Sequence, residues 1–327
     1  MPMRHSRVLA LLAALALIIG LGACSSSSTG SGETRAVETD QGAVQVPVDA
    51  QRVVLLNYSL AGYLFDLDVP VVAMTPAHTE RPGEFAPAWK EDAEKQGTNW
   101  LPWSADGFDT EAILAQDPDL IIAGGLGFPL KHATEAYSEL SKIAPTVVVS
   151  GDLTQWQQQF EFLADKVFDK PQVYDDAVKA YDDRITQVRD AITVPAGESA
   201  FLSMTADGNV YVLIENRGLP KEFEKLGFRP APLFATGKYQ PYVAGGDSFA
   251  LSTEQVGQVL TMDTLFVIGF QTQTQTVAEL RKRPIFAQLP AFEKNQAYDL
   301  PYGAQRGNYD DAMELLTIVE QTFAKDK

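Results

Sequence analysis

The fold is decided by a stretch in the middle of the chain, PQVYDDAVKAYDDRITQVRDAI, which covers residues 171–192. Its apolar residues recur at helical spacing on one stripe, which comprises Tyr174, Ala177, Val178, Tyr181, Ile185, Val188 and Ile192. A helix of about 20 residues is roughly 30 Å long, which is the width of a small domain. Because the stretch lies between two halves that alternate strands and helices, it is predicted to be a strut that connects them. An ordinary surface helix is the alternative.

On the N-terminal side of this stretch, short apolar runs alternate with helical segments. The runs at 53–56, 71–73, 120–123 and 146–149 are predicted strands, and helices are predicted at 60–67, 110–116 and 134–143. Continuous apolar strands separated by helices are typical of a parallel sheet that is covered on both faces. A capping box at Thr154-Gln155-Trp156-Gln157 is expected to open the next helix.

The same alternation restarts on the C-terminal side. Strands are predicted at 200–204 and 210–214, joined by a hairpin turn at 206–209, and again at 265–268. Helices are predicted at 220–226, 252–260 and 310–325. The second of these begins with a capping box at 252–255. The sequence therefore predicts an α/β protein of two Rossmann-like lobes, residues 44–168 and 195–327, joined by a single long helix within 169–194.

The start of the chain predicts secretion. Arg4 and Arg7 precede an apolar run from Val8 to Ile19, which is too short to span a bilayer because a span takes about 20 apolar residues. Leu21-Gly22-Ala23-Cys24 then resembles a bacterial lipobox, in which the signal is cut before the cysteine and its thiol is lipidated. We expect residues 1–23 to be a signal peptide and Cys24 to be the lipidation site. An ordinary signal peptide with an incidental cysteine is the alternative.

The expected anchor places the protein on the extracytoplasmic face of the cell membrane. Residues 24–43 are rich in Ser and Gly and are predicted to be a flexible linker. Several acyl chains together make a stable anchor where one would not. Removal of residues 1–23 takes away two arginines and no acid, so the net charge changes from −17 to −19. A surface this acidic repels phosphate backbones, which argues against nucleic acid as a partner.

Motifs for catalysis, nucleotides and metals are absent from the sequence. The glycine pairs at 124–125 and 245–246 lack the spacing of phosphate loops, and no Gly-x-Ser-x-Gly nucleophile elbow occurs. The mature chain has two histidines, His78 and His132, so a three-histidine metal site cannot be assembled. Both are expected in exposed loops, and ligation of haem iron by one of them with a tyrosine is the alternative. No enzymatic activity, resident metal or cofactor is predicted.

Three segments in order, at 51–56, 111–122 and 140–148, resemble the iron-siderophore substrate-binding lipoproteins of ABC importers. Later, Leu251 to Gln255 followed by Asp263 to Val267 matches a helix and strand of that family. The resemblance covers residues 44–325. It implies two lobes with the ligand in the cleft between them, a ferric siderophore as cargo with iron only as part of it, and delivery to the permease subunits without chemical change. A monomer is expected.

Candidate ligand residues are those in loops that follow strand ends, because ligands of open α/β sheets lie beyond the carboxyl ends of the strands. Aromatic faces can cover a chelate, and arginine supplies charge and forked hydrogen bonds. The predicted ligand residues are Asn57, Tyr58, Trp103, Phe128, Arg217, Tyr239, Tyr242, Tyr302 and Arg306.

Several alternatives remain open at this point. A haem or corrinoid carrier belongs to the same class, and an envelope enzyme or interaction module is a third possibility. The acidic surface favours neutral or cationic hydroxamates over trianionic catecholates. The family resemblance implies an acidic residue on each lobe tip that contacts the permease. The first-lobe position is occupied by Gly62, which leaves Glu80 or Glu84 as substitutes, and Glu222 and Glu224 are the second-lobe candidates.

Overall fold

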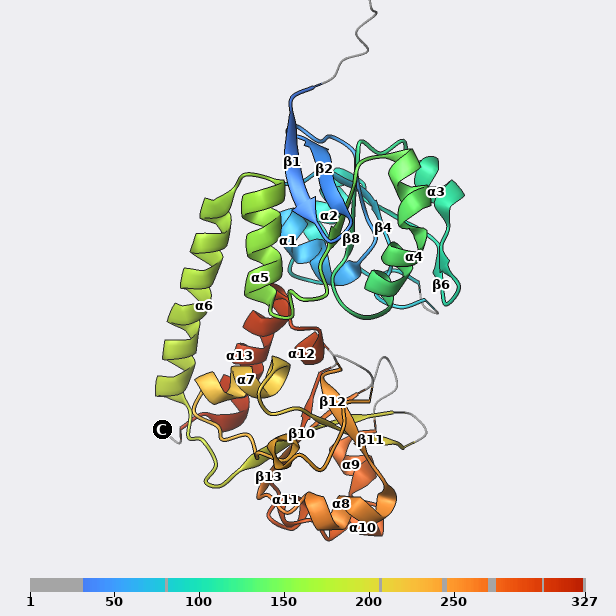
Figure 1. The fold of residues 1–327 in the computed structure, drawn as a ribbon. Coiled ribbons are helices and arrows are strands. Elements are labelled where there is room, and N and C mark those ends of the chain that lie inside the picture. Colours follow the sequence, from blue (N-terminus) through green and yellow to red (C-terminus); the bar gives the residue numbers. More distant parts are fainter. Residues whose placement is uncertain are drawn as a thin grey trace, which may run out of the picture.

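The computed structural model describes residues 32–79, 82–205, 208–242, 246–269, 275–301 and 303–325, and of residues 305 and 306 the backbone alone. They form two α/β lobes, drawn one above the other in Figure 1, with a long helix along one side. The predicted fold class is therefore confirmed. Within the described ranges, no helix combines the length and the apolar character that a membrane crossing requires. Cys24 and the predicted signal peptide lie outside these ranges.

The first lobe is built on a parallel sheet with the strand order β5-β4-β3-β8-β9. Its strands are β3 (Val53–Leu55), β4 (Val71–Met74), β5 (Asn99–Trp100), β8 (Leu120–Gly124) and β9 (Thr146–Val149). Every residue of β3, β8 and β9 is buried, as expected for strands covered on both faces. The connecting helices are η1 (Tyr58–Leu60), α1 (Ala61–Asp66), α2 (Lys90–Gln96), α3 (Thr110–Leu114) and α4 (Gly127–Ile143).

Regular structure begins earlier than the sequence predicts. The strands β1 (Thr34–Thr39) and β2 (Gly42–Pro47) form an antiparallel hairpin that begins within the predicted flexible linker and ends in the predicted first lobe. Val37, Val44 and Val46 point inward and join the core of the first lobe. The linker prediction is therefore wrong for residues 34–43. A short amphipathic hairpin needs only these few apolar residues, because its other face remains in water.

The predicted connecting helix is confirmed as α6 (Pro171–Ala191), with Pro171 in its first turn, where the missing N–H costs nothing. Its buried residues Ala177, Tyr181, Ile185 and Val188 belong to the predicted stripe. The helix α5 (Trp156–Glu161) and the π-helix η2 (Phe162–Val167) lead into it. The capping box of α5 uses Gln155 and Gln158, one residue later than predicted.

The second lobe has a mixed sheet with the order β12-β11-β10-β13-β14. The strands β10 (Ser199–Met204), β13 (Thr264–Gly269) and β14 (Ala297–Leu300) are parallel, whereas β11 (Val210–Leu213) is antiparallel to β10 and to β12 (Ser248–Leu251). The end of β11 therefore lies at the edge where β10 and β12 begin. The helices are α7 (Gly218–Lys225), η3 (Phe234–Thr236), α8 (Thr253–Val259), α9 (Val277–Leu280), α10 (Pro284–Ala287), α11 (Pro290–Glu293) and α12 (Gly303–Arg306).

A second helix, α13 (Tyr309–Phe323), bridges the lobes beside α6 (Figure 1). At its start, the Tyr309 ring lies 5.2 Å from that of Trp156 on α5. At its end, the Phe323 ring lies 4.7 Å from that of Tyr298 in the second lobe. One continuous apolar core contains residues of both lobes, α6 and α13. The chain crosses from lobe to lobe through α6, as predicted, but two packed helices hold the lobes together.

The start of α13 also meets α1 of the first lobe. A Cβ atom built on Gly62 would lie 2.0 Å from Oδ2 of Asp310, so the carboxylate occupies the space that any larger residue would need. Burial and, to a smaller extent, the negative charge of Asp66 raise the pKa of Asp310 to about 7. Gly62 is thus a buried packing position in this structure.

Candidate ligand-binding site

Four of the predicted ligand residues gather at one edge of the first lobe. Asn57 and Tyr58 follow β3, Trp103 follows β5, and Phe128 follows β8. Because these strands run parallel in one sheet, their carboxyl ends lie at the same edge, where ligands of such sheets bind. The structure therefore places these four predicted residues at one edge of the first-lobe sheet.

Asn57 has a structural role there. Its side chain is 3% exposed, its Nδ2 donates to the carbonyl of Gly124 at 2.6 Å, and its Oδ1 accepts from the amide of Ser59 at 2.9 Å. These bonds tie the ends of β3 and β8 together and cap η1. We therefore assign Asn57 to the framework of the site, since its buried amide presents no surface to a ligand.

Tyr58 belongs to an aromatic group with Phe85, Trp89 and Trp100. Its ring stacks with Trp100 at 6.4 Å and meets Trp89 edge-on at 5.3 Å, and Phe85 stacks on Trp100 at 4.6 Å. The Tyr58 hydroxyl donates to the carbonyl of Glu84 at 3.0 Å. The group thereby fastens the loop before α2 onto the edge of the sheet.

Trp103 belongs to a second aromatic group, the Trp103 wall, which also contains Phe108, Phe128 and His132. The small antiparallel pair β6 (Trp103–Ser104) and β7 (Gly107–Phe108) places Trp103 and Phe108 at 6.2 Å between ring centroids. The first turns of α4 bring Phe128, which is 58% exposed, to 5.9 Å from His132. The wall therefore has an exposed aromatic surface and a buried back.

His132 is that buried back, which contradicts the expectation of an exposed loop. It lies on α4 and is 2% exposed. Its Nδ1 accepts a hydrogen bond from Nε1 of Trp103 at 3.0 Å, while its buried Nε2 has no hydrogen-bond partner in the described structure. An imidazole buried behind aromatic rings does not reach a ligand at the surface, so the structure does not favour His132 as a haem ligand. The other histidine, His78, is a half-buried loop residue.

In the second lobe, Arg217, Tyr239 and Tyr242 lie near the edge where β12 begins. Nη1 of Arg217 donates to the carbonyl of Gly246 at 3.1 Å. Tyr239 stacks on Phe249 at 4.4 Å, whereas Tyr242 is 50% exposed. Burial and the nearby Asp247 raise the pKa of Tyr242, so its hydroxyl stays a hydrogen-bond donor at neutral pH.

Two of the predicted ligand residues are not placed in the same detail. Tyr302 lies outside the described residues, and of Arg306 only the backbone in α12 is described.

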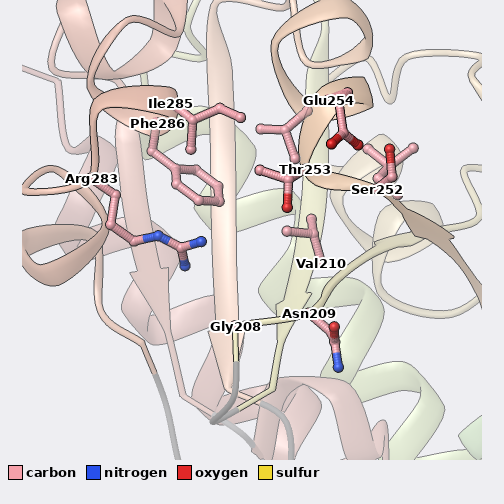
Figure 2. A pocket seen from close by; sticks show the side chains of 11 residues that line it. Gly208, Asn209, Val210, Ser252, Thr253, Glu254, Arg283, Ile285 and Phe286 are labelled. Carbon is pink, nitrogen blue, oxygen red and sulfur yellow. The ribbon is translucent and has the colours of Figure 1, made fainter.

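A cavity of about 270 Å³ lies at the opposite edge of this sheet, beside the turn between β10 and β11 (Figure 2). Arg283, Ile285 and Phe286 lie on one side of it, and the start of α8 lies on the other. Arg283 donates to Oε1 of Gln275 at 2.8 Å, and its guanidinium lies 4.9 Å from the centre of the Phe286 ring. No sequence signal marks Arg283, because its neighbours in the cavity come from distant segments.

The described residues contain no group of three or more His, Cys, Asp or Glu side chains that could hold a metal ion. What they do contain is aromatic surface at the carboxyl edge of one lobe and aromatic and cationic side chains in the other. Two α/β lobes bridged by helices are the fold that this chain shares with its structural neighbours, the class III periplasmic binding proteins. The chain belongs to the periplasmic binding protein family, whose model matches residues 53–303.

The relatives carry names of binding proteins. The ferric enterobactin-binding periplasmic protein FepB of Escherichia coli is 26% identical over 297 residues, which cover 88% of this chain and 91% of FepB. The iron(3+)-hydroxamate-binding protein FhuD of Bacillus subtilis is 26% identical over 215 residues, which cover 63% of this chain and 62% of FhuD. The crystal structure of Staphylococcus aureus SirA with staphyloferrin B superimposes with a TM-score of 0.69 at 20% identity and covers 90% of this chain and all of SirA. This last likeness is one of fold.

Proposed function

We propose that this protein is a membrane-anchored extracytoplasmic binding protein that captures a ferric siderophore between its lobes and delivers it to the permease of an ABC importer. The observation that carries the proposal is the aromatic surface at the carboxyl edge of the first-lobe sheet, formed by the Tyr58 group and the Trp103 wall. Family membership supports it, because relatives named for ferric siderophores match most of the chain.

The side chains fit such a cargo chemically. A ferric siderophore is a bulky chelate with an aromatic or amide periphery that is often anionic. Aromatic rings offer it large rigid surfaces at low entropic cost, and arginine offers a planar fork of hydrogen-bond donors. We assign cargo contact to Tyr58, Trp103 and Phe128 in the first lobe. In the second lobe we assign it to Arg217, Tyr239, Tyr242, Tyr302 and Arg306.

The test is a tryptophan fluorescence titration of residues 25–327 against a ferric catecholate, a ferric hydroxamate, ferric citrate, haem and a corrinoid. Trp100 and Trp103 are the expected reporters, since both lie at the ligand edge. Quenching that saturates with a ferric chelate supports the proposal, and Trp103→Phe should reduce its amplitude. If the protein binds only haem or a corrinoid tightly, that ligand replaces the ferric siderophore as the proposed cargo. Recovery of a chemically altered chelate would indicate an enzyme.

Permease docking needs acidic residues that are accessible. Gly62 is buried against Asp310, and Glu80 lies outside the described residues, so the exposed Glu84 is the first-lobe candidate. In the second lobe, the Glu222 side chain is 13% exposed and accepts hydrogen bonds from Tyr181 and Lys225, whereas the Glu224 side chain, which pairs with Lys221, is 54% exposed. We propose that Glu84 and Glu224 face the permease. Charge reversal of both should reduce uptake at limiting levels of the binding protein without changing cargo affinity, and unchanged uptake would reject this pair.

A further inference from the structure

The contact between Trp103 and His132 assigns a hydrogen-bonding role to each ring: the indole N–H is the donor and the imidazole Nδ1 is the acceptor. Because Nδ1 of His132 accepts the indole N–H at 3.0 Å, Nδ1 carries no proton. The other ring nitrogen, Nε2, is buried and has no hydrogen-bond partner among the described residues. The bond joins β6, in a short exposed hairpin, to α4, a helix packed on the sheet. This hydrogen bond therefore ties the hairpin to the helix at the position of Trp103.

The same contact removes the polar group of Trp103 from the surface. The indole N–H is the only hydrogen-bond donor of a tryptophan side chain, and here it points back toward His132. The half-buried Phe108 and the exposed Phe128, which complete the wall, have no polar atoms in their side chains. What the Trp103 wall offers to a ligand is therefore ring surface without side-chain donors.

We propose that His132 is a positioning residue that fixes Trp103 in this donor-free wall, and that the wall makes the site prefer ferric chelates with aromatic arms. This inference rests on the proposed function. Aromatic rings gain energy from offset stacking and edge contacts with one another beyond their buried area, which an aliphatic hydroxamate arm does not share. Net charge favours the opposite preference, but charges beyond about 10 Å are largely screened at physiological salt, whereas ring contacts are not.

Two substitutions at one position separate positioning from packing. His132→Asn keeps an acceptor oxygen close to the place of Nδ1, whereas His132→Leu fills the space and removes the acceptor. The leucine variant leaves the indole N–H without a partner, and such a group turns toward water because its burial is unfavourable. The indole N–H signal of Trp103 in nuclear magnetic resonance, identified by its loss in Trp103→Phe, reports this directly. It should shift in the leucine variant and stay near its original position in the asparagine variant.

Dissociation constants are then measured for a ferric tris-catecholate and a ferric tris-hydroxamate. We expect the parent protein to bind the catecholate about three- to tenfold more tightly, which is the worth of one aromatic pair. His132→Leu should weaken catecholate binding about five- to tenfold, the worth of one hydrogen bond, and His132→Asn should stay within about threefold of the parent. Hydroxamate binding should change less than twofold in both variants.

The outcomes separate this inference from the function on which it rests. Failure of the parent to bind either chelate overturns this inference, and failure to bind ferric citrate as well rejects the proposed function with it. Binding of both chelates with equal affinity overturns the preference alone. Equal affinities for the leucine and asparagine variants, with the indole signal unmoved in both, overturn the positioning role of His132.

Discussion

Asp310→Asn should stabilise the protein at alkaline pH. Asp310 is half-buried at the start of α13, against Gly62 on α1, and its pKa is raised from the ordinary value of 3.8 to about 7. A carboxyl group with a raised folded-state pKa holds its proton more tightly in the folded protein. The stability it contributes is complete below about pH 4 and is lost as the pH rises through about 7.

The size of the effect follows from the two pKa values. At about 1.4 kcal/mol per pH unit between them, ionisation costs the folded state at most about 4 kcal/mol. Solvent reaches part of the carboxylate, and the first turn of a helix favours anions, so we expect about 2 kcal/mol. Asparagine has nearly the same shape and no charge. An ordered chain of this size has an unfolding entropy of roughly 0.6 kcal/mol/K, so the melting temperature of Asp310→Asn should exceed that of the parent by about 3 °C at pH 8.

Scanning calorimetry between pH 4 and pH 8 measures this difference. The gap in melting temperature between Asp310→Asn and the parent should be close to zero at pH 4 and open as the pH rises. Asp40→Asn, in the exposed turn between β1 and β2, is the matched control and should show no such opening. A gap that is the same at every pH, or a variant less stable than the parent at pH 8, would refute the reasoning.

Three further predictions concern the framework, the cargo and the anchor. Asn57→Ala should lower the free energy of unfolding in urea by about 2–3 kcal/mol, because the carbonyl of Gly124 and the amide of Ser59 lose a buried partner; an unchanged midpoint would contradict its structural role. Arg217→Ala should weaken ferric chelate binding roughly 10- to 150-fold in the fluorescence titration while the melting temperature is kept, and undiminished affinity would remove it from the site. Cys24→Ala should release the protein from membranes with unchanged cargo affinity, and continued membrane retention with acylation would contradict the lipid anchor.

The parts of the fold that the sequence predicts are those whose patterns are local and complete. Strands buried on both faces, such as β8, appear as unbroken apolar runs, and the stripe of α6 marks both its length and its inner face. The β1–β2 hairpin was missed because its inward-facing valines are spread among residues typical of a linker. In the sequence-based prediction, the linker-like composition of the whole segment outweighs the alternation of apolar and polar residues, which lasts only six residues in each strand.

The burial of His132 was missed for a different reason. The sequence predicts the helix that carries it only from Thr134 onward, which leaves His132 in a loop. The helix starts at Gly127, and its first turn accepts Pro129 because the first N–H groups of a helix need no partner within it. A proline two residues after a helix start is therefore no evidence for a loop.

The candidate site depends on strand direction, which no apolar run reveals. The loop after β11 was placed with the other carboxyl ends, but β11 is antiparallel, so Arg217 follows a strand end at the edge where β10 begins. The cavity beside Arg283 is also lined by segments that lie about 30 and 75 residues earlier in the sequence. No local sequence pattern shows that these segments lie close together in the fold. The candidate residues of the first lobe are easier to assign to one edge of the sheet, because every strand of that sheet runs in the same direction.

The pairing of α6 with α13 has a mechanical consequence. A single helix between two lobes allows them both to bend and to rotate relative to each other, whereas two helices packed side by side resist rotation about their common axis. The end of the chain adds a lock, since the amide of Lys325 donates to the carbonyl of Ala191 and that of Thr193 to the carbonyl of Phe323. We therefore expect any closure of the lobes to be a shallow rocking in one plane. Such a motion would bring the two facing surfaces together in the same alignment at each closure.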